Sequence, residues 1–341
     1  MMLKNLLTAA ALALAATTAA DAATGCVGRD LIADLPQADR DRIAAAVERV
    51  PYHRGLLWRA TKGDQRITLV GTYHFADPRH DATLAAIAPD LADAAVLMVE
   101  AGPEEQDRLT AALASDPSLM VDADGPTLPE RLEDEEWEIL SRAMAERGMP
   151  AVLTAKLRPW YVSLMLGISP CMMQAMLESG VKGSLDDRLM QDAAAHDLPV
   201  RALEPWDTVF TIFANLTPEQ EIGMIRATLP QAAYADDYAV TLANAYFAGD
   251  VWSLWEFGRL DAQENTDLTD AEIEEQFTLA EDLLMNRRNA SWIAPLTTAA
   301  AEAAQQGKGI VAGFGALHLP GEQGVLNLLA RDGWAIERLD G

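Results

Sequence analysis

ITLVGTYH, from Ile67 to His74, is a β-branched apolar run that closes in Gly-x-x-His, and GIVAGFGALH, from Gly309 to His318, repeats that arrangement near the other end of the chain. Apolar runs of this kind predict buried strands. We expect Gly71 and Gly315 to allow a sharp turn that delivers each histidine just beyond the carboxyl end of its strand. Ligands of α/β sheets bind at that edge, so the repeat predicts a shared site.

Each motif belongs to a predicted strand–helix–strand unit. Residues 81–94 look helical and lead into the strand AAVLMVE, which ends at Glu100, and residues 322–331 predict a helix before the strand WAIERL at 334–339. A crossover of this length normally makes its two strands parallel and close in one sheet. We therefore expect Glu100 to lie at the same edge as His74, and the strand at 334–339 to be the parallel neighbour of the strand before His318.

If both units share one sheet, His74, Glu100 and His318 converge from opposite ends of the chain. Two imidazoles and one carboxylate suit a divalent metal such as Zn, Mn or Co. A strand-end histidine by itself is often only a hydrogen-bonding group, and Glu100 by itself would cap a helix. The chain has only five histidines, so two in matching positions favour a site over unrelated structural roles.

The residues resemble the TraB/GumN family, which is related to the TIKI metalloproteases and remotely to the erythromycin esterases and ChaN-like proteins. This resemblance implies a core of two βαβ repeats with a helical insertion, and a metal-dependent hydrolase site at the Gly-x-x-His motifs. It covers most of the mature chain and rests on LVGTYH with Glu100 downstream, RPW at 158–160, GSLDDRL at 183–189, PVRALEPWD around Glu204, RRN at 287–289 and GFGALHLPG at 313–321.

Carried over by position, the resemblance makes His74, Glu100 and His318 the metal ligands or catalytic groups. It also places Arg288 and Asn289 as a polar pair near the pocket, where a buried guanidinium holds a substrate carboxylate or phosphate, or pairs with a protein carboxylate.

Three further residues are candidates to contact and orient the site residues: Arg158, Glu204 and Asp77. Glu204 is followed by Pro-Trp-Asp where many relatives look like Glu-Thr, so plain structural support is its alternative role. A tight Asp-Pro turn is the alternative for Asp77.

These residues predict an exported metal-dependent hydrolase that resembles a peptidase or amidase and acts on a peptide or small molecule. The chain has no HExxH helix and no GxSxG elbow, so zincin and serine hydrolase mechanisms have no support. One alternative is a metal-free esterase of the erythromycin esterase type, with His74 as general base and Arg288 orienting the ester. Another is a non-catalytic binding protein that assists surface polysaccharide export.

The first residues indicate export. An apolar run after Lys4 and small residues before Ala23 predict a signal peptide over 1–22, hence a periplasmic or secreted protein, and no later segment suits a transmembrane helix. An exported chain with two cysteines favours a Cys26–Cys171 disulfide, with a lipidated Cys26 as the alternative. A net charge of −26 argues against nucleic acid as a partner.

No linker divides the mature chain, so we predict one composite α/β domain over residues 23–341. Its sheet comes from about residues 52–102 and 309–341, and a mainly helical insertion, about residues 103–308, covers the carboxyl edge. Two finer features are expected within this plan. A hairpin turns at TKGDQ, residues 61–65, and a short strand over 200–203 ends at Glu204.

Overall fold

The computed structural model describes residues 26–179, 183–214, 216–266 and 268–340. The predicted signal peptide, residues 1–22, lies outside this part of the chain. Within it, no helix combines the length and the apolar character that crossing a membrane requires.

Six strands form a single sheet in the order β4-β3-β5-β2-β1-β6. The strands β2, β5, β3 and β4 pair in parallel, whereas β1 runs antiparallel to both β2 and β6. The predicted α/β class is confirmed, because one mainly parallel sheet is combined with many helices. The sheet takes its strands from both ends of the chain, as expected. The strands are β1 (Leu57–Lys62), β2 (Gln65–Thr72), β3 (Ala94–Val99), β4 (Val200–Ala202), β5 (Gly309–Gly315) and β6 (Ala335–Arg338).

The two strands that carry the repeated motif lie side by side. β2 and β5 pair in parallel, with Ile67 opposite Ile310 and Thr72 opposite Gly315, so both motifs leave the sheet at the same edge. The expectation that the last strand is the parallel neighbour of β5 was wrong, whereas β2 and β3 are parallel and close in one sheet, as expected. β5 inserts between β2 and β3, and β1 occupies the other side of β2, so β6 pairs with β1 at the sheet margin.

The predicted hairpin and the short strand are both present. β1 pairs with β2 from Leu57↔Val70 to Lys62↔Gln65, and Gly63 takes a φ of 60° in the two-residue turn, a conformation that favours glycine. β4 pairs with β3 in parallel, and Glu204 follows it at the same carboxyl edge as Glu100.

Helices cover both faces of the sheet, which explains why its central strands are apolar throughout. On one face α16 (Arg287–Ala304) and α17 (Val325–Arg331) pack against alternate residues of β5, including Ile310 and Phe314. On the other face α3 (His80–Ala92) and α10 (Leu185–Ala195) pack around Val311. Each core helix thereby has a fixed position relative to the strand ends.

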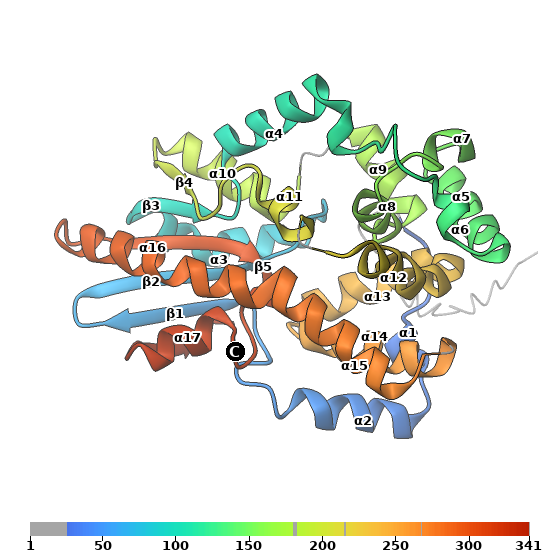
Figure 1. Ribbon diagram of the computed structural model, residues 1–341. Helices are drawn as coiled ribbons and strands as arrows, with labels where there is room; N and C mark the ends of the chain where they lie inside the picture. The colour runs from blue at the N-terminus through green and yellow to red at the C-terminus, as the bar shows by residue number, and fades with distance from the viewer. Residues whose placement is uncertain (1–25, 180–182, 215, 267, 341) are drawn as a thin grey trace, which may run out of the picture.

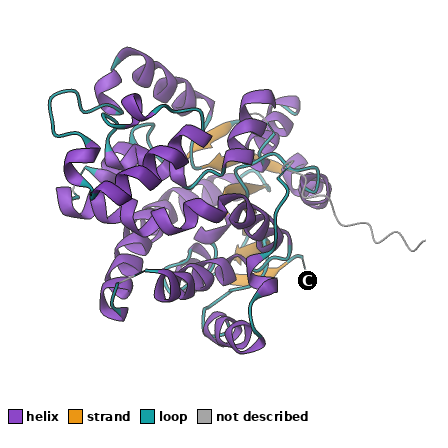
Figure 2. Cartoon of the chain, turned by 90° about the vertical axis from the view of Figure 1, so that its right-hand side faces the viewer, coloured by secondary structure: helices purple, strands orange, loops and turns teal. Residues whose placement is uncertain are grey.

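The insertion is mainly helical, and most of its helices lie beyond the carboxyl ends of the parallel strands, whereas α10, β4 and α16 belong to the sheet and the layers on its faces (Figure 1). Seen from that side, helices stand in front of the strands, as predicted (Figure 2). The remaining helices are α1 (Leu31–Asp34), α2 (Gln37–Val47), α4 (Pro103–Ser115), α5 (Leu128–Arg131), α6 (Asp134–Glu146), α7 (Ala151–Thr154), α8 (Pro159–Leu166), α9 (Pro170–Ser179), α11 (Thr208–Phe213), α12 (Pro218–Thr228), α13 (Ala235–Phe247), α14 (Val251–Asn265) and α15 (Asp270–Glu281).

The predicted disulfide joins Cys26 to Cys171, with the two Cα atoms 5.3 Å apart. It ties the N-terminal arm to the insertion and belongs to an apolar cluster that includes Tyr73 and Ala316, which lie within the two repeated motifs. Because the Cys26 sulfur forms this disulfide, it cannot also form the thioether bond of a lipidated cysteine.

Candidate functional site

The two motif glycines serve close packing rather than a sharp turn. Neither has a positive φ: Gly71 lies within β2, and Gly315 closes β5 with a φ of −47°. A Cβ at Gly71 would lie 2.7 Å from a Leu319 methyl and 3.0 Å from the Ala316 side chain. Any larger residue there would push the first motif away from the second.

The space in front of Gly315 is where the predicted site residues meet. A Cβ at Gly315 would lie 3.2 Å from His74 Nε2, 3.3 Å from Glu100 Oε1 and 3.5 Å from His318 Cδ2. The structure therefore brings these three side chains together at the carboxyl edge of the sheet, and a Cβ at position 315 would crowd His74 and Glu100.

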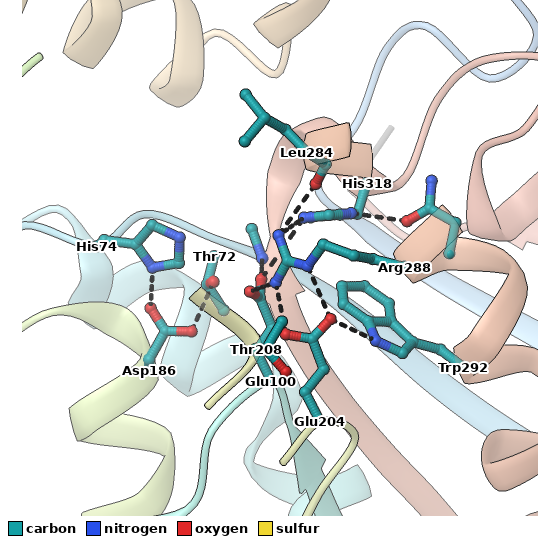
Figure 3. Close-up of polar contacts among 12 residues, drawn as sticks. Thr72, His74, Glu100, Asp186, Glu204, Thr208, Leu284, Arg288, Trp292 and His318 are labelled. Carbon is teal, nitrogen blue, oxygen red and sulfur yellow. Dashed lines mark hydrogen bonds and ion pairs between the residues drawn. The ribbon is translucent and has the colours of Figure 1, made fainter. Parts of the chain in front are cut away.

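His74 is held by a carboxylate from the insertion (Figure 3). Its Nδ1 donates to Asp186 Oδ2 at 2.9 Å, and Thr72 Oγ1 donates to Asp186 Oδ1 at 2.7 Å. Ser184 caps the start of α10, and the Leu185 amide donates to the Tyr73 carbonyl, which fixes the helix start beside the first motif.

The His74 ring is 60% exposed, yet its environment favours the imidazolium. Partial desolvation of the ring lowers the pKa of His74. The hydrogen bond and charge of Asp186, together with the charge of Glu100, outweigh that effect and raise the pKa to about 9. His74 is therefore mainly protonated at pH 7.

His318 has the same geometry and the opposite electrostatics. Its Nδ1 contacts Asn289 Oδ1 at 2.6 Å, and Nε2 lies 3.2 Å from Arg288 Nη1. A guanidinium cannot accept a hydrogen bond, so Nε2 is the acceptor and Nδ1 carries the proton. Burial, and then the charges of Arg288 and His74, lower the pKa of His318 to about 3 against the pull of Glu100, so the ring stays neutral.

Arg288 is the cation at the centre of the cluster. Its Nε and Nη2 bind the Glu204 carboxylate at 2.7 and 2.9 Å, and Nη2 also donates to Glu100 Oε2. Nη1 donates to His318 Nε2 and to the Leu284 carbonyl at 3.0 Å, which lies in a π-helical turn, Asp282–Asn286, just before α16. All five N–H groups of Arg288 thus have acceptors.

Glu100 is kept ionised at the centre of this cluster. Burial opposes its ionisation, but His318, Arg288 and His74 together with the Gly315 amide outweigh burial and lower the pKa of Glu100 to about 2. We assign the main role to Arg288, because it is a permanent cation whereas His318 is neutral. The Gly315 N–H donates to Glu100 Oε1 at 2.6 Å.

The three supporting candidates have different fates. Glu204 belongs to the cluster, where it also accepts from Trp292 Nε1 at 3.0 Å. Arg158 does not reach it: this residue precedes α8, and its Nε donates to the Ser118 carbonyl at 2.7 Å. Asp77 is buried and accepts from the backbone and side chain of Arg79, as a tight turn requires.

The donor set does not fit a divalent metal in this arrangement. Among the described residues, no group of three or more His, Cys, Asp or Glu side chains is disposed to hold a metal ion. Arg288 contacts both Glu100 and His318, and both Glu100 oxygens already accept N–H groups. A metal at this position would have to displace a guanidinium whose hydrogen bonds are all satisfied.

Sequence reasoning missed three residues of the cluster: Asp186, Thr72 and Trp292. Asp186 lies in the GSLDDRL stretch, which contributed to the family resemblance but was given no chemical role. Thr72 is the last residue of β2, two residues before His74, and its side chain binds the same Asp186 carboxylate as His74. Trp292 follows Arg288 by one helical turn in α16, a spacing that places both on one face.

This fold and cluster define a class: an α/β protein whose sheet and polar site are assembled from both ends of the chain around two strand-end histidines. The chain matches the model of the TraB/PrgY/gumN family over residues 56–338, and it belongs to that family. The resemblance to the TraB/GumN family is thereby confirmed. No curated protein and no solved structure matches the chain.

Proposed function

We propose that this protein is a hydrolase of ester or amide bonds that uses His74 for proton transfer and Arg288 as its resident cation. The observation that carries the proposal is the convergence of His74, Glu100 and His318 in front of Gly315, with Arg288 seated among them. A partly exposed imidazole beside a buried fixed charge is an arrangement typical of acid–base catalysis.

The chemistry follows from the free nitrogen of His74. Asp186 engages Nδ1, so Nε2 faces the space in front of Gly315. In the neutral ring, which is the minor form at pH 7 and grows as pH rises toward 9, Nε2 accepts a proton from water as the water oxygen attacks the acyl carbon. The ring then returns that proton to the leaving group. The imidazolium that forms on His74 offsets the charge of the developing oxyanion, whereas Arg288, whose charge is balanced by Glu100 and Glu204, holds the cluster in place.

Arg288 also limits the substrate class. Since Glu100, Glu204, His318 and the Leu284 carbonyl occupy its N–H groups, Arg288 has no free fork for a bidentate clamp on a substrate carboxylate or phosphate. The Glu100 and Glu204 carboxylates beside it further disfavour an anionic acyl group. Neutral or cationic acyl substrates, peptides included, fit the site better.

A metal-dependent peptidase or amidase is the second candidate. The convergence of His74 Nε2 and Glu100 Oε1 within 3.3 Å of one point in front of Gly315, with His318 beside them, favours it. The position of Arg288 opposes it, because the guanidinium must withdraw before the three side chains are free to act as ligands.

We assign the reaction to an oxidising compartment outside the cytoplasm. The Cys26–Cys171 disulfide supports this assignment, because such bonds persist in periplasmic and secreted proteins.

The test combines turnover with metal content. Purified protein is assayed on neutral, cationic and anionic esters, anilides and peptides before and after chelation, beside His74→Ala and a His196→Ala control. His196 lies at the exposed end of α10, where its Nδ1 contacts the Asp192 carbonyl of the same helix. We expect turnover that survives chelation and disappears only in His74→Ala. Turnover that needs stoichiometric metal supports the second candidate, and no turnover on any substrate supports a binding protein.

A further inference from the structure

The two histidines are oriented by side chains from helices on opposite faces of the sheet. Asp186 is the second residue of α10, which packs on one face, and Asn289 is the third residue of α16, which packs on the other. In each case an oxygen near a helix start binds Nδ1 of the ring, at 2.9 Å for His74 and 2.6 Å for His318. Both rings therefore turn Nε2 toward the centre of the cluster.

Asp186 is itself fixed by the strand that carries His74. Thr72 Oγ1 donates to one carboxylate oxygen and His74 Nδ1 to the other, so the carboxylate spans two residues of one strand end. The hydrogen bond from the Leu185 amide to the Tyr73 carbonyl holds the neighbouring backbone. A carboxylate bound by two side chains, beside a backbone that is itself held, has little freedom to rotate, and neither has the ring that it binds.

The amide at position 289 shows what the carboxylate at 186 adds. Asn289 is 2% exposed, and its Nδ2 donates to the Gln323 carbonyl, which leaves Oδ1 for the ring. That half of the site already has Glu100 and Glu204 around one guanidinium, so a neutral acceptor avoids a third buried anion. The hydrogen-bond partners of Asp186 are Thr72 and His74, neither of which is an anion.

We propose that Asp186 is a positioning residue for His74: through its hydrogen bond to Nδ1 it holds the ring with Nε2 toward the reacting groups, and it fixes which nitrogen carries the proton. The catalytic consequence rests on the proposed hydrolase, whereas the orientation itself does not. A carboxylate in this position selects the Nδ1–H tautomer, which leaves the Nε2 lone pair free.

The experiment compares Asp186→Asn with Asp187→Asn, which removes a carboxylate one residue along the same helix and outside the Thr72 and His74 contacts. Turnover gives kcat and KM. Long-range proton–nitrogen NMR correlations of the ring, recorded above its pKa, report which nitrogen of neutral His74 carries the proton. For Asp186→Asn we expect kcat to fall about 10²-fold with KM unchanged, and the proton to move largely to Nε2. Asp187→Asn should match the wild type in both.

Two results would overturn the proposal: an Asp186→Asn protein that keeps the wild-type tautomer, or an Asp187→Asn protein that changes kcat and tautomer equally. The tautomer is read without substrate. Absence of turnover in the wild type would therefore contradict only the proposed hydrolase function. The NMR result would still decide whether Asp186 positions His74.

Discussion

The two Gly-x-x-His motifs place their histidines alike and give them different chemistry. His74 is 60% exposed and faces a carboxylate, whereas the His318 side chain is 7% exposed and faces an amide and a guanidinium. The result is an imidazole that is ready to exchange protons and another that serves as a fixed neutral acceptor. The repeated motif determines where the rings lie, and the partners supplied by α10 and α16 determine what each ring can do.

We refer to His74 with Asp186 as the first half of the site and to His318 with Asn289 as the second half. The largest effect is expected from removing Arg288, the cation at the centre of the cluster. Arg288→Met leaves the largely buried Glu100 and Glu204 carboxylates without the cation that pairs with them, and breaking such a pair costs about 3–5 kcal/mol of unfolding free energy. Urea denaturation measures this. The control is Arg287→Met, at a neighbour whose side chain is 64% exposed. Equal losses in the two variants would contradict the central role of Arg288.

Removing the exposed ring separates activity from stability. His74→Ala should lower kcat/KM about 10³-fold, the scale of a lost general base, while the unfolding free energy changes by less than about 1 kcal/mol because the ring and its ion pair are partly exposed. His318→Ala should cost stability as well, since that ring is buried against Trp292 and Arg288. If the two variants behave alike in both measurements, the distinction between the halves is wrong.

Asn289→Asp makes the second half resemble the first. A carboxylate beside Nδ1 should raise the pKa of His318 above its present value of about 3, in the direction already seen for His74. The new anion joins two buried carboxylates, so we expect a loss of about 1–3 kcal/mol of stability. An NMR titration of the ring tests the shift, and an unchanged pKa would show that burial alone sets it.

The smallest effect is a difference in how pH acts on the two halves. The folded-state pKa of His74 is about 9 against an ordinary 6.5, so its stabilising contribution is complete below pH 6.5 and lost as pH rises through 9. For His318 the folded value is about 3, so its contribution is present above pH 6.5 and lost as pH falls toward 3. Unfolding of His74→Gln and His318→Gln proteins beside the wild type, from pH 4 to 10, should show differences that shrink at opposite ends of the range.

Most of the fold could be predicted because strand and helix signals are local. The apolar runs around Ile67 and Ile310 form strands, and the hairpin turns at Gly63, where the sequence indicates. Strand order could not be predicted in the same way, because the side on which β6 pairs depends on which edges the earlier strands leave free. No local pattern carries that information.

The site was predictable only where it follows the strands. His74, Glu100, Glu204 and His318 all lie just beyond strand ends, so their convergence follows from a parallel sheet. Asp186 comes from the start of a helix in the insertion, and nothing in its local pattern indicates which strand that helix meets. The sequence also failed to show that Arg288 would lie among the expected metal ligands, because that depends on side-chain geometry.

The position of β5 has a consequence for the order in which this chain acquires its structure. The strand lies between β2 and β3, which do not pair with each other. These two early strands join one sheet only when β5, near the end of the chain, is available to pair with both. The register that sets Ile67 against Ile310 is a contact between remote segments, of the kind that slows folding. A nascent chain that emerges from its amino terminus therefore cannot close its sheet until its last segment has been synthesised.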